Sequence, residues 1–509
     1  MRGAAKRGEE RKRLWSDNSE EQGLSARYDL VVIGGGTAGL VSAAGGASLG
    51  ARVALVERDR LGGDCLYHGC VPTKALVKSA RVVSLVNRAE EFGIRTSGAG
   101  VDFPAVMGRM RRVMETAGES DDPDRFRGLG VEVYLGNEAH FDSPYEISVD
   151  GSRLEAGSSI IATGSHSVAP PMEGMEEAGY ITHVEALRLE RLPRSIVIIG
   201  SGPIGSEFAQ IFARFGSRVE VISSSIRPLP KEDPEIGEAL RHFLVRDGVT
   251  FHGGFRAEEV RVENGEKIVT ARDDRGENME VRGEEILVAA GRAPTVGGLG
   301  LENAGVEVEE RGIKVDDRLR TTASNIYAAG DVTGKYLFTH MAEYQGRTAL
   351  RNALFPLKTR ADYRVVPWTT FTDPEVARVG LTEDEARQEH KGVRVFRQPF
   401  AAVDRAIADG EPDGLVKIVT GERGRVLGGH IIGPDAGNLI HEVVLAMQKN
   451  IPIQSLSTMI HVYPTLAQAN QRAADNYYRE KLFTDRNRKI LGAFFGVSRR
   501  LNRRRKSRP

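Results

Sequence analysis

The chain has 509 residues, and its 70 basic side chains balance its 70 acidic ones, so no global field points to a nucleic-acid partner. Hydrophobic residues make up 40% of the sequence, as in soluble globular proteins, and this length indicates two to four domains. Two cysteines exclude a disulfide scaffold and fit a cytoplasmic setting, and no apolar run reaches the roughly 18 residues that span a bilayer.

The first predicted elements form a nucleotide-binding unit behind a polar N-terminus. Residues 1–25 are charged and polar without an apolar core, which indicates a disordered tail and not a secretory signal. A strand at 28–33, a small-residue helix at 40–49 and a second strand at 52–56 follow. The glycines of the turn between the first strand and the helix are Gly34, Gly36 and Gly39. This is the βαβ dinucleotide fingerprint, in which glycines admit a pyrophosphate and Glu57 accepts hydrogen bonds from ribose hydroxyls.

The only two cysteines lie in the next stretch, residues 62–74, between glycines and a Pro-Thr-Lys sequence. A helix-compatible run after Cys70 would place a helix N-terminus there, and the positive end of a helix favours a reactive thiolate. Cys65 and Cys70 on one turn can open and close a disulfide, which is a two-electron reaction. Spacing alone leaves two alternatives open: a pair of buried structural cysteines, or a partial metal site, although zinc normally takes four ligands with tighter pair spacing.

A second fingerprint follows a run of less regular elements. Its strand is expected at 195–199, its helix at 206–215 and its second strand at 218–222, with glycines Gly200, Gly202 and Gly205. Two such folds imply two nucleotides. The second strand ends at Ser223, where an NAD site usually has Asp or Glu, and Arg227 follows. Loss of the carboxylate removes repulsion against a 2′-phosphate and Arg227 adds attraction, which favours NADPH over NADH unless Arg227 points to solvent.

The remaining elements before and after this fingerprint follow from hydrophobic pattern. Helices are expected at 75–91 and within 93–130, and strands at 131–135, 145–149, 159–161 and 285–290. From about residue 366 the pattern changes to strands and helices without a glycine fingerprint.

In their order along residues 28–476, these motifs resemble the class I pyridine nucleotide-disulfide oxidoreductases, the family of dihydrolipoamide dehydrogenase, glutathione reductase and mercuric reductase. The resemblance implies an α/β fold with two Rossmann-like domains, for FAD and NAD(P), and an α+β C-terminal domain that builds a homodimer. The expected parts are a disordered tail at 1–25, an FAD domain at 26–170 and 293–362, an NAD(P) domain at 171–292, an interface domain at 363–480 and a basic tail at 481–509.

The resemblance also implies roles for single residues. Cys70 would be the thiol next to the flavin, and Cys65 the interchange thiol that meets the substrate. Lys74 would lie near the flavin N5 and pair with Glu207, which from the residues alone is better read as a solvated helix residue. Asp331 would bind the ribityl chain of FAD. Further cofactor-binding positions would be Thr163, Gly164, Gly291 and the amides of His340, Met341 and Ala342 at a helix N-terminus facing the flavin.

The pattern departs from the family near the C-terminus, where disulfide-reducing members carry His-Pro-Thr-x-x-Glu. Here Tyr463 occupies the histidine position and Gln468 the glutamate position. Tyrosine is a poor base at neutral pH. His461, two residues upstream, is either a substitute base or a structural histidine. Mercuric reductase resembles this chain in having tyrosine there, but it passes mercury through a C-terminal cysteine pair, and this chain has no third cysteine.

Three functions remain open on the sequence. The first is an FAD-dependent NAD(P)H oxidoreductase that passes electrons through the Cys65–Cys70 disulfide to a small acceptor: a disulfide, a quinone or a metal ion. The second is mercuric reductase working from two cysteines, or dihydrolipoamide dehydrogenase. The third is a non-enzyme, either a flavin-binding redox sensor or a membrane-associated partner. Retention of the cysteines and both fingerprints favours an enzyme.

The end of the chain combines an apolar patch at 490–497 with a strongly basic run. Basic residues beside apolar ones can bind an anionic membrane surface. Residues 489–509 could therefore make peripheral contact with a membrane, although a solvated basic tail is the commoner outcome for such a sequence.

Overall fold

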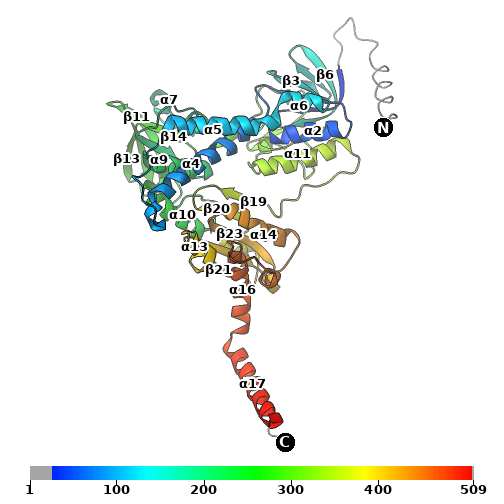
Figure 1. The fold of residues 1–509 in the computed structure, drawn as a ribbon. Helices are drawn as coiled ribbons and strands as arrows, with labels where there is room; N and C mark the ends of the chain where they lie inside the picture. The colour runs from blue at the N-terminus through cyan, green and yellow to red at the C-terminus, as the bar shows by residue number, and fades with distance from the viewer. Residues whose placement is uncertain (1–25, 507–509) are drawn as a thin grey trace. The chain divides into compact units, whose positions relative to one another are not determined.

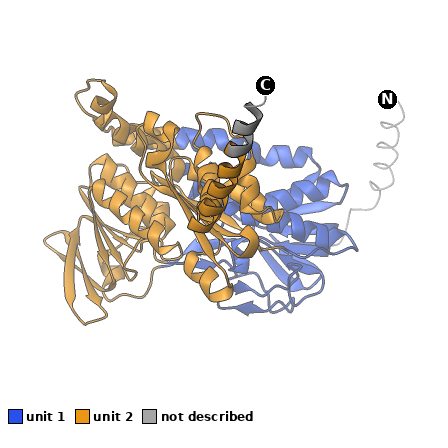
Figure 2. Ribbon diagram, turned by 90° about the horizontal axis from the view of Figure 1, so that it is seen from below, with its two compact units in different colours: residues 1–72, 111–168, 291–361 blue, residues 73–110, 169–290, 362–509 orange. Residues whose placement is uncertain are grey.

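The computed structural model describes residues 26–506, which form two compact units (Figure 2). Among the described residues, unit 1 comprises 26–72, 111–168 and 291–361, and unit 2 comprises 73–110, 169–290 and 362–506. The expected disordered tail at 1–25 lies outside the described residues, as do the last three residues of the chain. The expected domain boundaries stay predictions.

Unit 1 is built on one twisted, mostly parallel sheet. Its strands lie in the order β3-β2-β1-β6-β5-β4, with β18 paired to β6. They span β1 (Ala26–Ile33), β2 (Val53–Glu57), β3 (Val131–Leu135), β4 (Ala139–Ser143), β5 (Glu146–Val149), β6 (Ser152–Ile161) and β18 (Ile326–Ala328). Successive β1 residues pack into two different cores, Leu30 and Val32 on one face and Val31 and Ile33 on the other. Because both faces are buried, the strand has no polar alternation, as expected for a parallel sheet.

Two helices, α2 (Thr37–Ser48) and α11 (Thr339–Leu354), lie side by side against this sheet (Figure 1). Small residues allow the close approach, since a Cβ on Gly346 would come within 2.7 Å of the Ala38 carbonyl oxygen. Ser42 donates to the Gly346 carbonyl across the same crossing. The other elements of unit 1 are α3 (Gly63–Tyr67), η2 (Glu119–Asp121), α6 (Pro123–Gly128), β7 (Ser165–Ser167), β15 (Arg292–Pro294), β16 (Val308–Glu309), β17 (Gly312–Ile313) and η3 (Asp331–Thr333).

Unit 2 contains a parallel sheet in the order β10-β9-β8-β14, a three-stranded antiparallel sheet β11-β12-β13, and a five-stranded antiparallel sheet β19-β20-β23-β22-β21. The strands are β8 (Ser195–Ile199), β9 (Arg218–Ser223), β10 (Val249–Gly253), β11 (Phe255–Glu263), β12 (Glu266–Asp273), β13 (Asn278–Gly283), β14 (Glu285–Val288), β19 (Pro367–Thr370), β20 (Glu375–Gly380), β21 (Arg394–Pro399), β22 (Leu415–Thr420) and β23 (Val426–Gly433). The helices of at least ten residues are α9 (Pro203–Phe215), α10 (Pro234–Arg246), α14 (Ala436–Gln448), α16 (Gln468–Leu482) and α17 (Asp485–Lys506).

Two further helices, α4 (Cys70–Asn87) and α5 (Phe103–Gly118), run from unit 1 into unit 2 or back. The shorter elements of unit 2 are η1 (Ala89–Phe92), α7 (Met175–Ala178), α8 (His183–Ala186), α12 (Glu383–Glu389), η4 (Phe400–Ala402), α13 (Asp404–Ala408), η5 (Glu422–Gly424) and α15 (Ile453–Thr458). The expectation of a helix beginning at residue 75 was wrong by five residues. Helix α4 begins at Cys70 because Pro72 stands in its first turn, where a missing amide hydrogen costs no helical bond.

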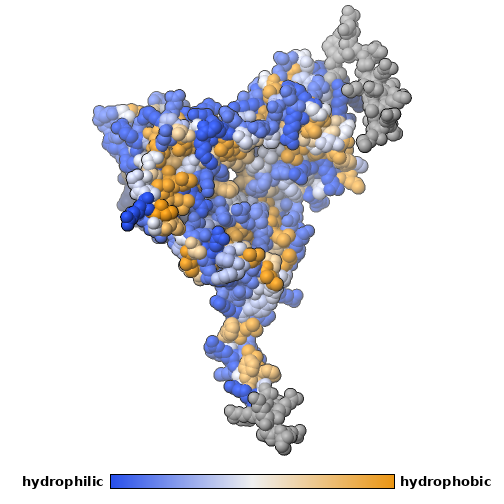
Figure 3. All heavy atoms as spheres, in the orientation of Figure 1, coloured by the Kyte–Doolittle hydropathy of each residue, from blue (hydrophilic) through white to orange (hydrophobic). Residues whose placement is uncertain are grey.

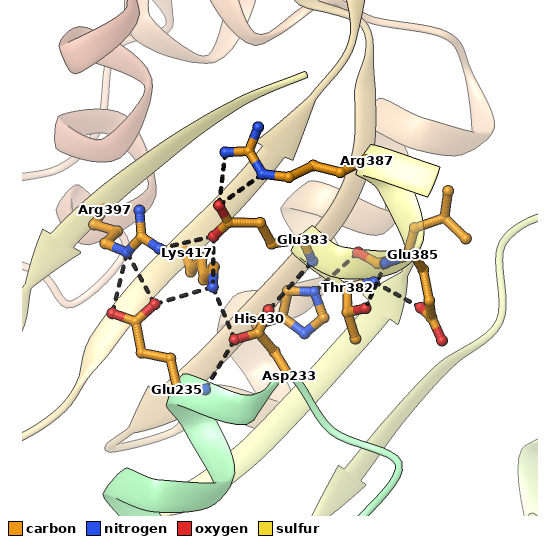
Figure 4. A network of polar contacts seen from close by, with 10 residues as sticks. Asp233, Glu235, Thr382, Glu383, Glu385, Arg387, Arg397, Lys417 and His430 are labelled. Atoms are coloured by element: carbon orange, nitrogen blue, oxygen red, sulfur yellow. Dashed lines mark hydrogen bonds and ion pairs between the residues drawn. The ribbon is translucent and has the colours of Figure 1, made fainter. Parts of the chain in front are cut away.

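A buried polar junction joins α10 to the five-stranded sheet within unit 2 (Figure 4). The Lys417 ammonium, with a side chain only 3% exposed, lies 2.8 Å from Asp233 and 3.0 Å from both Glu235 and Glu383. Asp233 also caps α10 by accepting from the Glu235 amide at 3.1 Å. A buried cation is held here by three carboxylates, so the pairing offsets its desolvation.

Candidate redox centre

The two cysteines lie at the junction of α3 and α4. Cys65 lies in α3, and Cys70 is the first residue of α4, an 18-residue helix. Both are thiols, and the Cys70 Sγ lies 3.3 Å from the Thr339 hydroxyl. The hydrogen bond with Cys70, followed by burial, raises the pKa of the Cys65 thiol far above its usual range. Helix α4 directs its positive end at Cys70, so the charge of the reduced pair is favoured on Cys70 and the proton on Cys65.

Helix α4 also carries Lys74, whose ammonium binds a buried carboxylate. Lys74 donates to both oxygens of Glu207, at 3.0 and 2.9 Å, and its Nζ lies 4.5 Å from the centre of the Phe371 ring. Glu207, on α9, is 4% exposed and also accepts from the Phe371 amide at 2.9 Å. The pair expected from the family is therefore present, and the solvated alternative for Glu207 is not what the structure shows. Its part in the reaction stays a prediction.

The glycines of the first fingerprint have different tasks. A Cβ on Gly34, whose φ is +107°, would meet the Ala162 carbonyl oxygen at 2.3 Å, and one on Gly39 would meet the Gly34 oxygen at 1.8 Å. These two glycines are required by the packing of the chain. Gly36 has no atom closer than 3.9 Å to such a Cβ, and as N-cap of α2 it has no side-chain cap. Open space in front of the uncapped amides at the N-terminus of α2 suits a pyrophosphate. The turn at residues 34–39, called the first cradle below, therefore fits the FAD that the fold family implies.

Glu57 ends β2 beside this cradle. One carboxylate oxygen accepts from the Gly35 amide at 2.5 Å, and the other accepts from the Asp59 amide at 2.8 Å. The two amides fix the carboxylate in one orientation. Each oxygen keeps a second lone pair, which leaves acceptors for the hydroxyls of a ribose.

A polar chain that the sequence analysis missed connects the residue before Cys65 to Asp331. The Arg292 guanidinium donates to Asp64 at 3.0 Å and to the Ser165 hydroxyl at 2.9 Å, and Ser165 in turn donates to Asp331 at 2.7 Å. Burial raises the pKa of Asp331 above its usual range. On the other side, His68 Nδ1 lies 3.6 Å from Asp64. No local signal could reveal this chain, since Asp64 and Arg292 are 228 positions apart.

The remaining positions expected around the flavin are placed as follows. The Thr163 hydroxyl donates to the Thr295 carbonyl at 2.6 Å. Gly164 has a left-handed φ of +71°, and its carbonyl accepts from the Thr295 amide at 3.0 Å. Gly291 precedes β15, and its carbonyl accepts from the Val168 amide at 3.2 Å. Gly164 and Gly291 therefore shape the connection between β7 and β15.

Helix α11 begins at Thr339, as expected, without a side-chain cap. The amides of Met341 and Ala342 already donate to the Phe338 carbonyl, at 3.0 and 2.9 Å. The His340 ring stacks on Phe338 with centroids 5.4 Å apart. The amides before Met341, and not those of Met341 and Ala342, are therefore the ones best suited to face a bound flavin.

The second cradle repeats the geometry of the first. A Cβ on Gly200 would meet the Ala289 oxygen at 2.6 Å, and one on Gly205 would meet the Gly200 oxygen at 2.0 Å, whereas Gly202 has open space around it. Ser223 is buried and its hydroxyl hydrogen-bonds with the Ser201 hydroxyl at 2.7 Å. Arg227 is half-buried near the end of the strand, and its amide donates to the Ser225 hydroxyl at 3.3 Å.

The two candidates for an acid–base group have opposite surroundings. The His461 side chain is 4% exposed, with Nε2 2.9 Å from Glu442 and Nδ1 3.0 Å from the Met459 carbonyl. Both ring nitrogens are occupied within unit 2, which supports the structural interpretation of His461. Tyr463 is 64% exposed. Gln468 begins α16, and its buried Oε1 has no hydrogen-bond partner among the described residues.

The same loop exposes Ile460, at 96%, and Val462, at 76%. Within residues 26–506 no group of three or more His, Cys, Asp or Glu side chains is placed to hold a metal ion.

Family models and known proteins match this chain over most of its length. The model of the pyridine nucleotide-disulphide oxidoreductases matches residues 28–346, and the model of their dimerisation domain matches residues 366–474. Dihydrolipoyl dehydrogenase of Bacillus subtilis (strain 168) is 35% identical over 89% of this chain and 98% of its own length. Mercuric reductase of Bacillus cereus is 35% identical over 87% of this chain and 70% of its own. The solved Cu(II) complex of RclA, an HOCl-induced flavoprotein disulfide reductase from Escherichia coli, is similar with a TM-score of 0.77, at 30% identity over 87% of this chain and 98% of that one.

Proposed function

The chain belongs to the pyridine nucleotide-disulphide oxidoreductase family, and from this premise we propose that it passes electrons from NADPH to the Cys65–Cys70 disulfide and from Cys65 to a small acceptor. Members of the family are FAD-dependent enzymes that use a pyridine nucleotide, and the dimerisation domain indicates a homodimer. The observation that carries the proposal is the contact between the two thiols at the start of α4.

The residues that would hold FAD are those of the first cradle. The uncapped N-terminus of α2 would bind the pyrophosphate, Glu57 the ribose and Asp331 the ribityl chain. Bound FAD supplies two-electron transfer between the nicotinamide and the disulfide. Arg292 and Ser165 orient Asp331, because both lie in the same hydrogen-bonded chain.

The cysteines divide the charge and the proton of the reduced state. Two electrons break the S–S bond and leave two sulfur atoms with two negative charges, one of which is neutralised by a proton. Cys65, with its raised pKa, holds the proton, and Cys70 holds the charge at the N-terminus of α4. Transfer of the electron pair to the acceptor restores the S–S bond and releases that proton. Glu207 keeps Lys74 in position throughout.

An anaerobic titration of the homodimer with NADPH tests this proposal. We expect uptake of two electrons per disulfide with a charge-transfer band from thiolate to flavin, and loss of that band in Cys70→Ser. The matched variant Cys65→Ser keeps Cys70 and should retain a band. Flavin bleaching that is the same in the wild type and in Cys70→Ser would refute coupling between the cysteines and the flavin.

The acceptor is best sought among molecules that need no imidazole base. Tyr463 stands exposed where disulfide-reducing relatives use histidine, and His461 is held by Glu442. We propose a quinone or a metal ion before a disulfide, and relatives named mercuric reductase and a relative solved with Cu(II) support the metal ion. Acceptor-dependent NADPH oxidation, compared for Hg(II), Cu(II), a quinone and lipoamide, distinguishes these classes. Lipoamide turnover that exceeds all others would refute this order.

The preference for NADPH rests on the end of β9. The Ser223 hydroxyl is buried against Ser201, so no carboxylate stands where a 2′-phosphate would lie, and Arg227 follows. We expect Arg227→Gln to lower kcat/KM for NADPH about tenfold, the worth of one charge-assisted contact, with little change for NADH. Arg423→Gln, an exposed arginine in η5, is the matched control. An unaltered ratio of the two efficiencies would exclude Arg227 from recognition.

A further inference from the structure

The C-terminal helix α17 presents an apolar surface that unit 2 does not cover. The helix spans Asp485–Lys506 and extends from the end of α16 away from the five-stranded sheet (Figure 1). Its large apolar side chains are about half exposed or more: Ile490 56%, Leu491 46%, Phe494 64%, Phe495 53% and Val497 57%. They appear as a patch of hydrophobic atoms on the helix (Figure 3).

These side chains share one side of the helix. At 3.6 residues per turn, Ile490, Phe494 and Val497 form one stripe, and Leu491 and Phe495 lie beside it. Basic residues occupy the other side and the edges: Arg486, Arg488, Lys489 and Arg499, all exposed. Across the residues whose side chains the structure describes, none of these four makes an ion pair with a carboxylate. The described turns of α17 are therefore amphipathic and cationic.

Charge along the chain is unevenly divided. Residues 481–509 contain 11 basic and one acidic residue, which leaves 59 basic and 69 acidic residues in the 480 that precede them. Although the whole chain has zero net charge, residues 481–509 are therefore cationic and the residues before them are acidic overall. No described helix has the length and apolar character to cross a bilayer, so α17 is suited to lie on a membrane surface and not to span it.

We propose that α17 binds the surface of a lipid bilayer that carries anionic headgroups, with its apolar stripe at the acyl boundary and its basic side among the headgroups. The basic residues complement the anionic surface, and the exposed phenylalanines favour lipid over nucleic acid, which offers no apolar layer to insert into. The inference does not depend on which acceptor the enzyme reduces.

Co-sedimentation of the holoenzyme with vesicles tests the proposal. One set of vesicles is pure phosphatidylcholine, and the other contains equal parts of phosphatidylcholine and phosphatidylglycerol. We expect binding to the anionic set alone at low salt. Replacing all four basic residues by glutamine should weaken it roughly 600-fold, from about fivefold for each charge. The double variant Phe494→Ser/Phe495→Ser should weaken it at unchanged charge.

The control variants are Lys391→Gln and Leu357→Ser, exposed residues outside α17. Both should bind as the wild type does, and every variant should keep the rate of NADPH-driven flavin reduction. Three results would overturn the proposal. The first is no sedimentation of the wild type with anionic vesicles, and the second is equal sedimentation of the Phe494→Ser/Phe495→Ser variant. The third is dissociation of the homodimer by that variant in the absence of lipid, because the apolar stripe would then be covered by the partner subunit.

Discussion

Replacing Lys417 by methionine should strongly destabilise unit 2. The ammonium is 3% exposed and lies within 3.0 Å of carboxylates on Asp233, Glu235 and Glu383. Methionine keeps the length of the side chain but leaves three negative charges without their shared cation (Figure 4). Breaking a buried ion pair on one side costs about 3–5 kcal/mol. We expect a loss in the middle of that range, since Arg397 still contacts Glu235 and Glu383.

The pH dependence of the stability lost in Lys417→Met is a second, independent test of the same junction. Desolvation opposes the charge of Glu383, but the hydrogen bonds from Arg387 and Lys417 and the charges of Lys417 and Arg397 outweigh it and hold the pKa of Glu383 at about 2. Desolvation also opposes the charge of Asp233, and the hydrogen bond and charge of Lys417 help to outweigh it and lower the pKa of Asp233. A carboxyl group with a lowered pKa in the folded state stabilises the fold above its unfolded value, near 4, and this contribution disappears as the pH falls toward 2. In Lys417→Met the carboxyl groups lose their main partner, so the difference from the wild type should shrink as the pH is lowered from 7 to 4.

Urea denaturation of the holoenzyme, followed by circular dichroism at several pH values, measures both effects. The matched control is Lys314→Met in unit 1, which breaks a surface pair with Glu307 at 2.7 Å between side chains about half exposed. That change should cost far less than the loss of Lys417, because the pair is exposed to solvent. A Lys417→Met loss as small as that of the control, or one independent of pH, would refute the idea that Lys417 is the cation on which this junction depends.

Three further changes test the redox centre and its cradle. Gly39→Ala should prevent FAD retention and destabilise unit 1 by about 3 kcal/mol or more, because its Cβ would lie 1.8 Å from the Gly34 oxygen; normal FAD content at normal stability would contradict this. Glu207→Gln should slow NADPH-driven flavin reduction about tenfold, as an uncharged partner for Lys74 remains, and an unchanged rate in stopped-flow absorbance would exclude that role. Asp331→Asn should raise the melting temperature of the apoprotein at pH 7, because burial raises the pKa of this carboxyl and its charge opposes folding above that pKa. The same variant should lose FAD on gel filtration. An Asp331→Asn apoprotein that is less stable than the wild-type apoprotein would contradict this prediction.

Both dinucleotide cradles could be predicted because every residue that defines them is local. Strand, glycines and helix follow within about thirty residues, and the steric demand on Gly39 comes from Gly34 in the same segment. The demand on Gly34 comes instead from the Ala162 carbonyl, which lies far along the sequence. The Lys74–Glu207 pair, in contrast, was expected only from resemblance to a family. Its residues alone favoured a solvated glutamate, and only the fold buries Glu207 against the Phe371 amide.

The polar chain from Asp64 to Asp331 and the carboxylates around Lys417 could not be predicted. Each is assembled by residues that are more than a hundred positions apart and follow no periodic pattern. The basic end of the chain was expected as a basic tail, and no helix was predicted there. The helix α17 that the structure shows there agrees with the favourable helix propensities of its Arg, Lys, Leu and Ala residues.

The C-terminal helix acquires a further property from the dimerisation domain. Two copies of the chain in one enzyme carry two copies of α17, so any surface that binds one copy meets the second at a high effective concentration. Weak attachment by a single helix can then become firm attachment by the pair. Residence on that surface would respond to protein concentration, because separation of the two subunits would leave each with the weak attachment of a single helix.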